Sequence, residues 1–207
     1  MSAEKRRVGR PSKAAVRADQ ILDAFTRCVA RFGLEGATLQ HVADEAGLAR
    51  GHIRHYVGNR DELRDLFEQR IISRFTDRAT ALASQSAAGR NAEALVHYFF
   101  GDELAPDDDS AAIDALLAAA RFDDDLRERI RAVYANLEKI LATALAEDHP
   151  GRPATVYENA AYQVLALAYG HWTFTEMGFP PARNAPALDL ALRVVKGVAD
   201  TPNKAGP

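Results

Sequence analysis

The chain has 207 residues, of which 47% are hydrophobic and 27% are charged. This composition excludes a disordered chain and suffices for one medium domain, or for a small domain joined to a larger one. A single cysteine excludes an internal disulfide and a cysteine-based metal cluster. The longest run without formal charge, residues 159–175, is shorter than the ~20 apolar residues that span a membrane. Because no apolar stretch follows the basic N-terminus, we expect no signal peptide and a soluble, cytoplasmic protein.

The net charge of −3 is unevenly divided along the chain. Residues 1–60 contain eleven Lys/Arg and six Asp/Glu, whereas residues 61–207 contain fifteen and twenty-three. A basic N-terminal part beside an acidic body indicates a DNA-binding module on a carrier that does not itself touch DNA. The polar arm at the start of the chain is expected to displace DNA counterions through Lys5, Arg6, Arg7, Arg10 and Lys13.

Helical periodicity runs through nearly every segment and no segment shows a convincing strand pattern, so we predict an all-α fold. The first helix is expected over about residues 15–32, ended by Gly33. The apolar residues expected on its buried face are Ile21, Leu22, Phe25, Cys28, Val29 and Phe32. A short loop then leads to Thr38, a good N-cap for the next helix. A capping box needs Glu or Gln at position 41, and because His41 stands there we expect no box.

Residues 39–58 have the sequence LQHVADEAGLARGHIRHYVG, the most informative segment of the chain. Val42 and Ala43 share one helical face, and Gly47 falls where a turn needs a left-handed residue. Leu48 and Ile53 are the apolar anchors of a second helix, expected over about residues 50–56. Other side chains of that helix point elsewhere and suit an acidic partner: Arg50, His52, Arg54 and His55. This pattern predicts a helix-turn-helix that binds double-stranded DNA.

The body of the chain is predicted as six further helices. The first begins near Arg60 or Asp61, and its apolar residues are Leu63, Leu66, Phe67, Ile71, Phe75 and Leu82. The others are expected at about residues 91–104, 110–121, 124–147, 153–177 and 186–199. The aspartates at 107–109 and 123–125 are better explained as helix N-caps than as a calcium loop, because the loop's spacing and glycine are missing. Asn184 is the expected cap of the last helix.

The last two predicted helices are unusually poor in charge. Residues 160–175 contain no Asp, Glu, Lys or Arg. A helix that is apolar nearly all round must bury both faces, and one of them needs a partner. Two such helices from each subunit would form an isologous four-helix interface, so we expect a homodimer through the last two helices. The alternative is a single, larger monomeric core.

The segment ILDAFTRCVARFGLEGATLQHVADEAGLARGHIRHYVGNRDELRDLF resembles the N-terminal domain of the tetracycline-repressor (TetR) family of bacterial transcriptional regulators. The similarity is continuous over about residues 17–67, and the rest of the chain is similar only in its helical layout. The resemblance implies a homodimer with an N-terminal three-helix helix-turn-helix DNA-binding domain and a helical ligand-binding and dimerisation domain. It also implies a repressor that leaves a palindromic operator when a small molecule enters the body. We expect a basic flexible arm at 1–13, a DNA-binding domain at 14–60 and the body at 61–207.

The expected DNA contacts fall into two groups. Thr38 can donate its hydroxyl to a phosphate at the N-terminus of its helix, and the resemblance implies backbone contacts from Tyr56 and Arg60. Arg can pair with guanine and Gln with adenine, and a glycine lets the helix approach closely. Base reading is therefore expected from Gln40, Arg50, Gly51, His52, Arg54 and His55, with Arg54 reading a guanine. The alternative is that these are ordinary solvated charges on an amphipathic helix.

Aromatic residues are concentrated in the body, where the resemblance implies an effector bound between helices. The expected pocket lining is Tyr134, Tyr162, His171 and Trp172, for an apolar or aromatic effector, and the alternative is that these residues are core. We find no phosphate loop, nucleophile elbow or Glu-x-x-His pair, so we expect no enzyme, no catalytic residues, no cofactor and no metal site. Two alternatives remain open: a DNA-binding regulator whose body binds a protein partner, and an activator.

Overall fold

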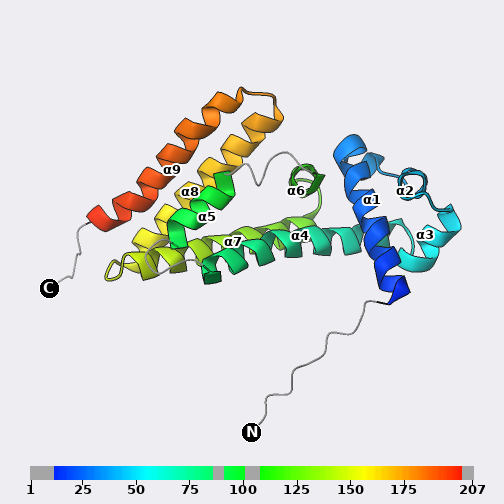
Figure 1. The fold of residues 1–207 in the computed structure, drawn as a ribbon, viewed down its shortest axis with the longest axis horizontal. Helices are drawn as coiled ribbons and strands as arrows, with labels where there is room; N and C mark the ends of the chain where they lie inside the picture. Colours follow the sequence, from blue (N-terminus) through cyan, green and yellow to red (C-terminus); the bar gives the residue numbers. More distant parts are fainter. Residues whose placement is uncertain (1–11, 86–90, 101–107, 202–207) are drawn as a thin grey trace, which may run out of the picture. The chain divides into compact units, whose positions relative to one another are not determined.

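The computed structural model describes residues 12–85, 91–100 and 108–201, and within these ranges the regular structure is entirely helical. This confirms the all-α prediction (Figure 1). The chain divides into two compact units, Met1–Arg70 and Ile71–Pro207. In chain order the α-helices are α1 (Lys13–Gly36), α2 (Leu39–Ala46), α3 (Arg50–Val57), α4 (Arg60–Gln85), α5 (Asn91–Phe100), α6 (Asp108–Ala119), α7 (Asp124–Asp148), α8 (Ala154–Glu176) and α9 (Asn184–Asp200).

The first helix, α1, is amphipathic and supplies much of the core of the N-terminal unit. Ile21, Phe25 and Val29 are buried one turn apart on the same face. Gly33 interrupts the helix with a left-handed φ of 72°, after which the chain continues to Gly36. The expected burial of Phe32 is wrong, because its side chain is 43% exposed. The ring of Phe32 stacks on His41 with a centroid distance of 4.4 Å, and the guanidinium of Arg31 lies 5.1 Å from its centroid.

The helices α1, α2 and α3 pack against one another, and α4 begins directly after them. Asn59 and Glu62 form a reciprocal cap at the start of α4: Asn59 Oδ1 accepts from the Glu62 backbone N–H at 3.0 Å, and Glu62 Oε2 accepts from the Asn59 N–H at 2.7 Å. Leu63 and Phe67 are buried as predicted. Leu66 is 39% exposed, which corrects its expected burial, because it lies on another face of α4. The side chain of Phe75 lies outside the described residues.

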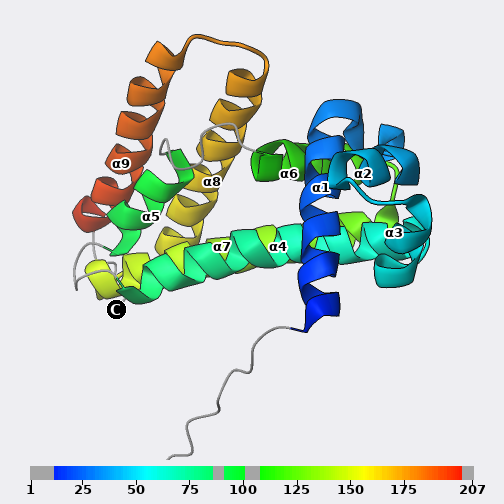
Figure 2. The ribbon, with the colours of Figure 1, turned by 45° about the vertical axis from the view of Figure 1, so that its right-hand side comes forward.

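The C-terminal unit is built from α5, α7, α8 and α9, with α6 packed on α7. Its core is lined by Leu95, Leu137, Leu141 and Val164, all at most 1% exposed. Figures 1 and 2 show α8 and α9 side by side and antiparallel, and α5 packs against both of them. The described helices include none long and apolar enough to cross a membrane.

Two expected helix caps have different outcomes. Asp123 caps α7 as predicted, with its Oδ1 accepting from the Leu126 N–H at 2.9 Å. Of the aspartates at 107–109, Asp107 and the side chains of the other two lie outside the described residues. The expected cap by Asn184 is wrong: this residue is already helical, and its Nδ2 donates to the carbonyl of Phe100 at 3.1 Å. Asn184 therefore ties α9 to the end of α5.

Candidate nucleic-acid interface

The N-terminus of α2 is closed by Thr38. Its backbone is extended, and its Oγ1 accepts a hydrogen bond from the His41 N–H at 3.2 Å. The hydroxyl proton remains available for an outside acceptor, and the residue is exposed. The prediction that no capping box forms is wrong, because His41 Nδ1 lies 3.4 Å from the Thr38 backbone nitrogen and replaces the usual carboxylate. An imidazole nitrogen can accept this hydrogen bond as a carboxylate oxygen does.

The turn between α2 and α3 has the expected left-handed residue. Gly47 has φ 63° and ψ 35°, and the next residue, Leu48, donates its N–H to the carbonyl of Ala43 at 2.9 Å. Val42 and Ala43 are both buried, which seats α2 against its neighbours. The turn thus sets the direction in which α3 leaves α2.

The third helix presents most of its surface to solvent. Ile53 and Val57 are its buried residues, at 0% and 3% exposed. Ala49 at the N-cap makes no side-chain hydrogen bond. The residues left exposed on α3 are Arg50, Gly51, His52, Arg54 and His55, all of them predicted base readers. The structure therefore brings these side chains together on one free helix surface.

The charged groups on α3 have no acidic partner within the part of the chain that the structure describes. Among the described residues, neither Arg50 nor Arg54 makes a recorded ion pair, and α3 itself contains no acidic residue. The space beside Gly51 is open as well, because a Cβ placed on this residue meets nothing within 4 Å. Such an unpaired basic helix is suited to a polyanion.

The remaining predicted DNA contacts are held by neighbours within the protein. Gln40 lies exposed on α2, and its Nε2 donates to Asp44 Oδ1 at 2.7 Å, which leaves Oε1 free to accept. Tyr56 is half-buried, with its ring edge-on to His55 and a centroid distance of 4.9 Å. The guanidinium of Arg60 hydrogen-bonds Glu35 and the preceding loop, an arrangement that the sequence prediction did not include.

The residues predicted to line an effector pocket are spread over the C-terminal unit. Tyr134 is partly buried and packs against Tyr169 with a centroid distance of 6.5 Å. Burial, followed by the charges of Tyr169 and Asp114, raises the pKa of the Tyr134 phenol. His171 stacks on Phe100 at 5.7 Å. Of the other two, Trp172 is half-buried, whereas Tyr162 is 65% exposed.

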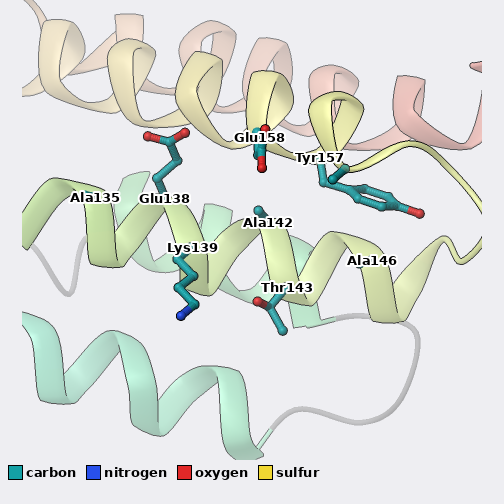
Figure 3. Close-up of a pocket in the computed structure, with 9 residues that line it drawn as sticks. Ala135, Glu138, Lys139, Ala142, Thr143, Ala146, Tyr157 and Glu158 are labelled. Atoms are coloured by element: carbon teal, nitrogen blue, oxygen red, sulfur yellow. The ribbon is translucent and has the colours of Figure 1, made fainter.

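A separate groove of about 460 Å³ lies between α7 and α8. Its floor includes Ala135, Ala142 and Ala146, and carboxylates come from Glu138 and Glu158. Figure 3 shows Glu138 directed from α7 toward α8, whereas Lys139 points to the opposite side. Among the described residues that line this groove, none is one of the four predicted pocket residues.

Comparisons with known proteins agree with this arrangement. Residues 21–67 match the model of the family described as bacterial regulatory proteins, tetR family. The HTH-type transcriptional regulator BetI of Escherichia coli (strain SMS-3-5 / SECEC) is 27% identical over 164 residues, which cover 76% of this chain and 81% of the relative.

Solved structures with the same fold cover nearly the whole chain. A transcriptional regulator from Pseudomonas aeruginosa PAO1 superimposes with a TM-score of 0.72 at 20% identity, covering 96% of this chain and 97% of the other. The regulator FadR of Bacillus subtilis, solved in complex with stearoyl-CoA, gives a TM-score of 0.62 at 19% identity, covering 87% and 97%.

An exposed basic helix after a glycine turn, on a small helical unit joined to a larger one, defines a helix-turn-helix DNA-binding transcriptional regulator. The DNA-binding unit of the chain belongs to the tetR family of bacterial regulatory proteins, whose model matches residues 21–67.

Proposed function

We propose that this regulator is a ligand-responsive repressor that binds a palindromic operator as a homodimer. The observation that carries the proposal is the exposed surface of α3, where two arginines and two histidines surround Gly51 without an acidic neighbour on the helix. A helix of this kind fits the major groove, where its side chains reach base edges. In this proposal Thr38 and Tyr56 contact phosphates and set the register.

The homodimer is supported by an exposed, uncharged face on α8. Tyr162, Ala166 and Tyr169 lie on this face, and Tyr162 and Tyr169 are 65% and 42% exposed. On α9, Leu190 is 42% exposed. Aromatic and aliphatic side chains of this size favour burial against a partner, and a twofold pairing of α8 and α9 would cover them. Two copies related by a twofold axis would present two α3 helices to a palindromic site.

An apolar or aromatic effector is proposed for the C-terminal unit. Support comes from its ring pairs, Tyr134 with Tyr169 and Phe100 with His171, which supply apolar surfaces beside a few polar groups. FadR of Bacillus subtilis, which shares the fold, was solved with stearoyl-CoA, and this supports a small-molecule effector in the helical body. Binding of an effector would favour a conformation with lower affinity for the operator.

The test is fluorescence anisotropy with labelled DNA from upstream of the protein's own gene, at two salt concentrations and with unlabelled competitor DNA. The proposal expects tight binding that survives scrambled competitor and weakens as salt rises. Binding that scrambled DNA abolishes equally would contradict a sequence-specific site in that region. Small molecules that release the DNA would support the effector proposal, whereas release only by a protein would favour a protein-binding body. Transcription measured in vitro separates a repressor from an activator.

A further inference from the structure

Arg60, at the start of α4, holds the last residues of α1, which follow the break at Gly33 and lead to α2. Its Nη2 lies 3.2 Å from the carbonyl oxygen of Leu34, 3.0 Å from that of Glu35 and 3.1 Å from Glu35 Oε2. Nη2 carries two protons, so the three acceptors share them. All three acceptors belong to the protein, so this nitrogen of the group predicted to bind a phosphate is already engaged.

The other carboxylate oxygen of Glu35 extends this contact along α4. Arg64 Nη1 lies 3.4 Å from Glu35 Oε1, and Arg64 Nε lies 2.7 Å from Oε1 of Glu68, whose side chain is 1% exposed. Positive and negative groups therefore alternate in the order Arg60, Glu35, Arg64, Glu68. A carboxylate as buried as that of Glu68 needs a paired cation, so this end of the series is firmly held.

The end of α1 fixed by these contacts leads directly to the phosphate-binding N-terminus proposed for α2. Leu34 and Ala37 are buried, and the Ala37 N–H donates to the carbonyl of Gly33 at 3.1 Å. Thr38 follows directly and is the N-cap of α2. Fixing the carbonyls of residues 34 and 35 against α4 therefore limits where the Thr38 hydroxyl and the first N–H groups of α2 can lie.

We propose that Glu35, Arg60 and Arg64 act as positioning residues that hold the N-terminus of α2 in place for a DNA phosphate, and that Arg60 does not itself bind one. This inference rests on the proposed phosphate contact of Thr38. Arg50 and Arg54 provide the contrast, because among the described residues neither has a recorded partner within the protein. We call Glu35, Arg60 and Arg64 the clamp. The clamp affects DNA affinity through the position of Thr38, whereas the arginines of α3 contact DNA directly.

The substitution Glu35→Gln distinguishes a positioning role from simple electrostatics, because the two predict opposite changes in DNA affinity. Glu35 is a 72% exposed carboxylate in the DNA-binding unit, so removing its charge strengthens DNA binding if it has no positioning role. The clamp predicts instead that operator binding weakens about threefold. Asp65→Asn is the matched control, since Asp65 is exposed on α4 and has no recorded partner among the described residues. The affinity of the Asp65→Asn variant for operator DNA should be unchanged or higher.

The substitutions Arg60→Gln and Arg60→Lys test whether Arg60 binds a phosphate. A lost phosphate contact lowers the slope of log affinity against log salt by about 0.9. The clamp predicts weaker binding, about tenfold for Arg60→Gln, with no change in that slope. Lysine keeps the charge, but its ammonium ends one bond short of the position of Nη2, so Arg60→Lys should bind as weakly as Arg60→Gln. A phosphate contact would instead be largely retained by lysine.

The measurements are anisotropy titrations of the full chain on operator DNA over a range of salt, with thermal unfolding by circular dichroism for each variant. Should Arg60→Gln not fold, Glu35→Gln and Arg60→Lys still decide the matter. Tighter binding by Glu35→Gln, or a slope lowered by about one in Arg60→Gln, would overturn the clamp. Thr38→Val distinguishes the two proposals: if it has no effect on wild-type binding, the Thr38 phosphate contact fails. The clamp then fails with it, whereas weaker binding by Thr38→Val together with unchanged binding by Glu35→Gln would overturn the clamp alone.

Discussion

The ring of Phe67 packs edge-on against the ring of Phe25, with centroids 4.9 Å apart and an interplanar angle of 64°. The two side chains are 0% and 1% exposed. This contact joins α4 to α1 within the N-terminal unit, and α1 is also the helix against which α2 and α3 pack. The aromatic pair therefore supports the surface that meets DNA without touching DNA itself.

Replacing Phe67 with alanine should lower the free energy of unfolding of the N-terminal unit by about 3–5 kcal/mol, because it removes a fully buried ring and leaves a cavity. Chemical denaturation followed by circular dichroism measures the change. The neighbouring substitution Leu66→Ala is the matched control, since that side chain is 39% exposed and should cost much less. Equal losses for the two variants would show that the pair does not anchor α4.

Arg54→Ala should reduce affinity for operator DNA by about 1–3 kcal/mol and affinity for scrambled DNA far less, because the prediction gives Arg54 a bidentate contact with guanine. Competition anisotropy on both DNAs measures the difference. Arg131→Ala on α7, which removes an equally exposed guanidinium from the other unit, should leave both affinities unchanged. If Arg54→Ala weakened binding to both DNAs by the same factor, Arg54 would contact only phosphate.

Introducing a carboxylate into the exposed face of α8 or α9 should prevent dimerisation, because a buried unpaired charge is costly. Tyr162→Glu and Leu190→Glu are the test variants, and Ala199→Glu on the opposite side of α9 is the control. Sedimentation equilibrium at micromolar concentration should find monomers for the first two and dimers for the control and the wild type. Operator affinity should fall at least about tenfold with the dimer, because the second α3 is no longer tethered. A wild-type monomer would refute the interface.

The thiol of Cys28 should react slowly in the folded protein. Its side chain is 1% exposed, and burial, followed by the nearby carboxylate of Glu45, raises the pKa of the thiol. We expect labelling by a thiol reagent at pH 8 to be about 100-fold or more slower than in denaturant, because it requires local opening. Because only the unfolded chain ionises near its ordinary pKa, the free energy of unfolding should also fall as pH rises above about 9. Rapid labelling of folded protein would contradict this burial.

Deletion of residues 2–11 tests the basic arm, which lies outside the described residues. The deletion removes Lys5, Arg6, Arg7 and Arg10 but keeps Ser12, whose Oγ caps α1 by accepting from the Ala15 N–H at 3.1 Å. If these cations displace counterions, the slope of log affinity against log salt should fall by up to about 3–4. An unchanged slope would show that the arm does not contact DNA.

Much of the candidate site could be predicted from the sequence because it depends on local chemistry. Thr38 caps a helix through an N–H three residues away, and Gly47 adopts a left-handed conformation that other residues avoid. The alternation on α3 between buried Ile53 and exposed arginines follows from the helical period. The same period, applied to the uncharged run in α8, indicated a face in need of a partner.

Contacts between side chains that are far apart in the sequence could not be predicted from these local patterns. Phe32 and Leu66 are apolar and correctly spaced, yet their side chains are 43% and 39% exposed. His41 completes a cap that sequence rules assign to Glu or Gln. The spacing of Arg60, Arg64 and Glu68 could have indicated an ion-pair series along α4, but not its link to Glu35, twenty-five residues before Arg60.

The sequence by itself determined the helices, the caps by Thr38 and Asp123 and the basic surface of α3, because these follow from interactions within a few residues of each other. Only the tertiary structure decided which side chains remain free for a partner. Arg54 and Arg60 are the same residue type six positions apart, and the sequence assigned both to DNA. The fold brings the carbonyls of Leu34 and Glu35 to Arg60 and, among the described residues, gives Arg54 no recorded partner, since donor and acceptor meet only when distant segments pack.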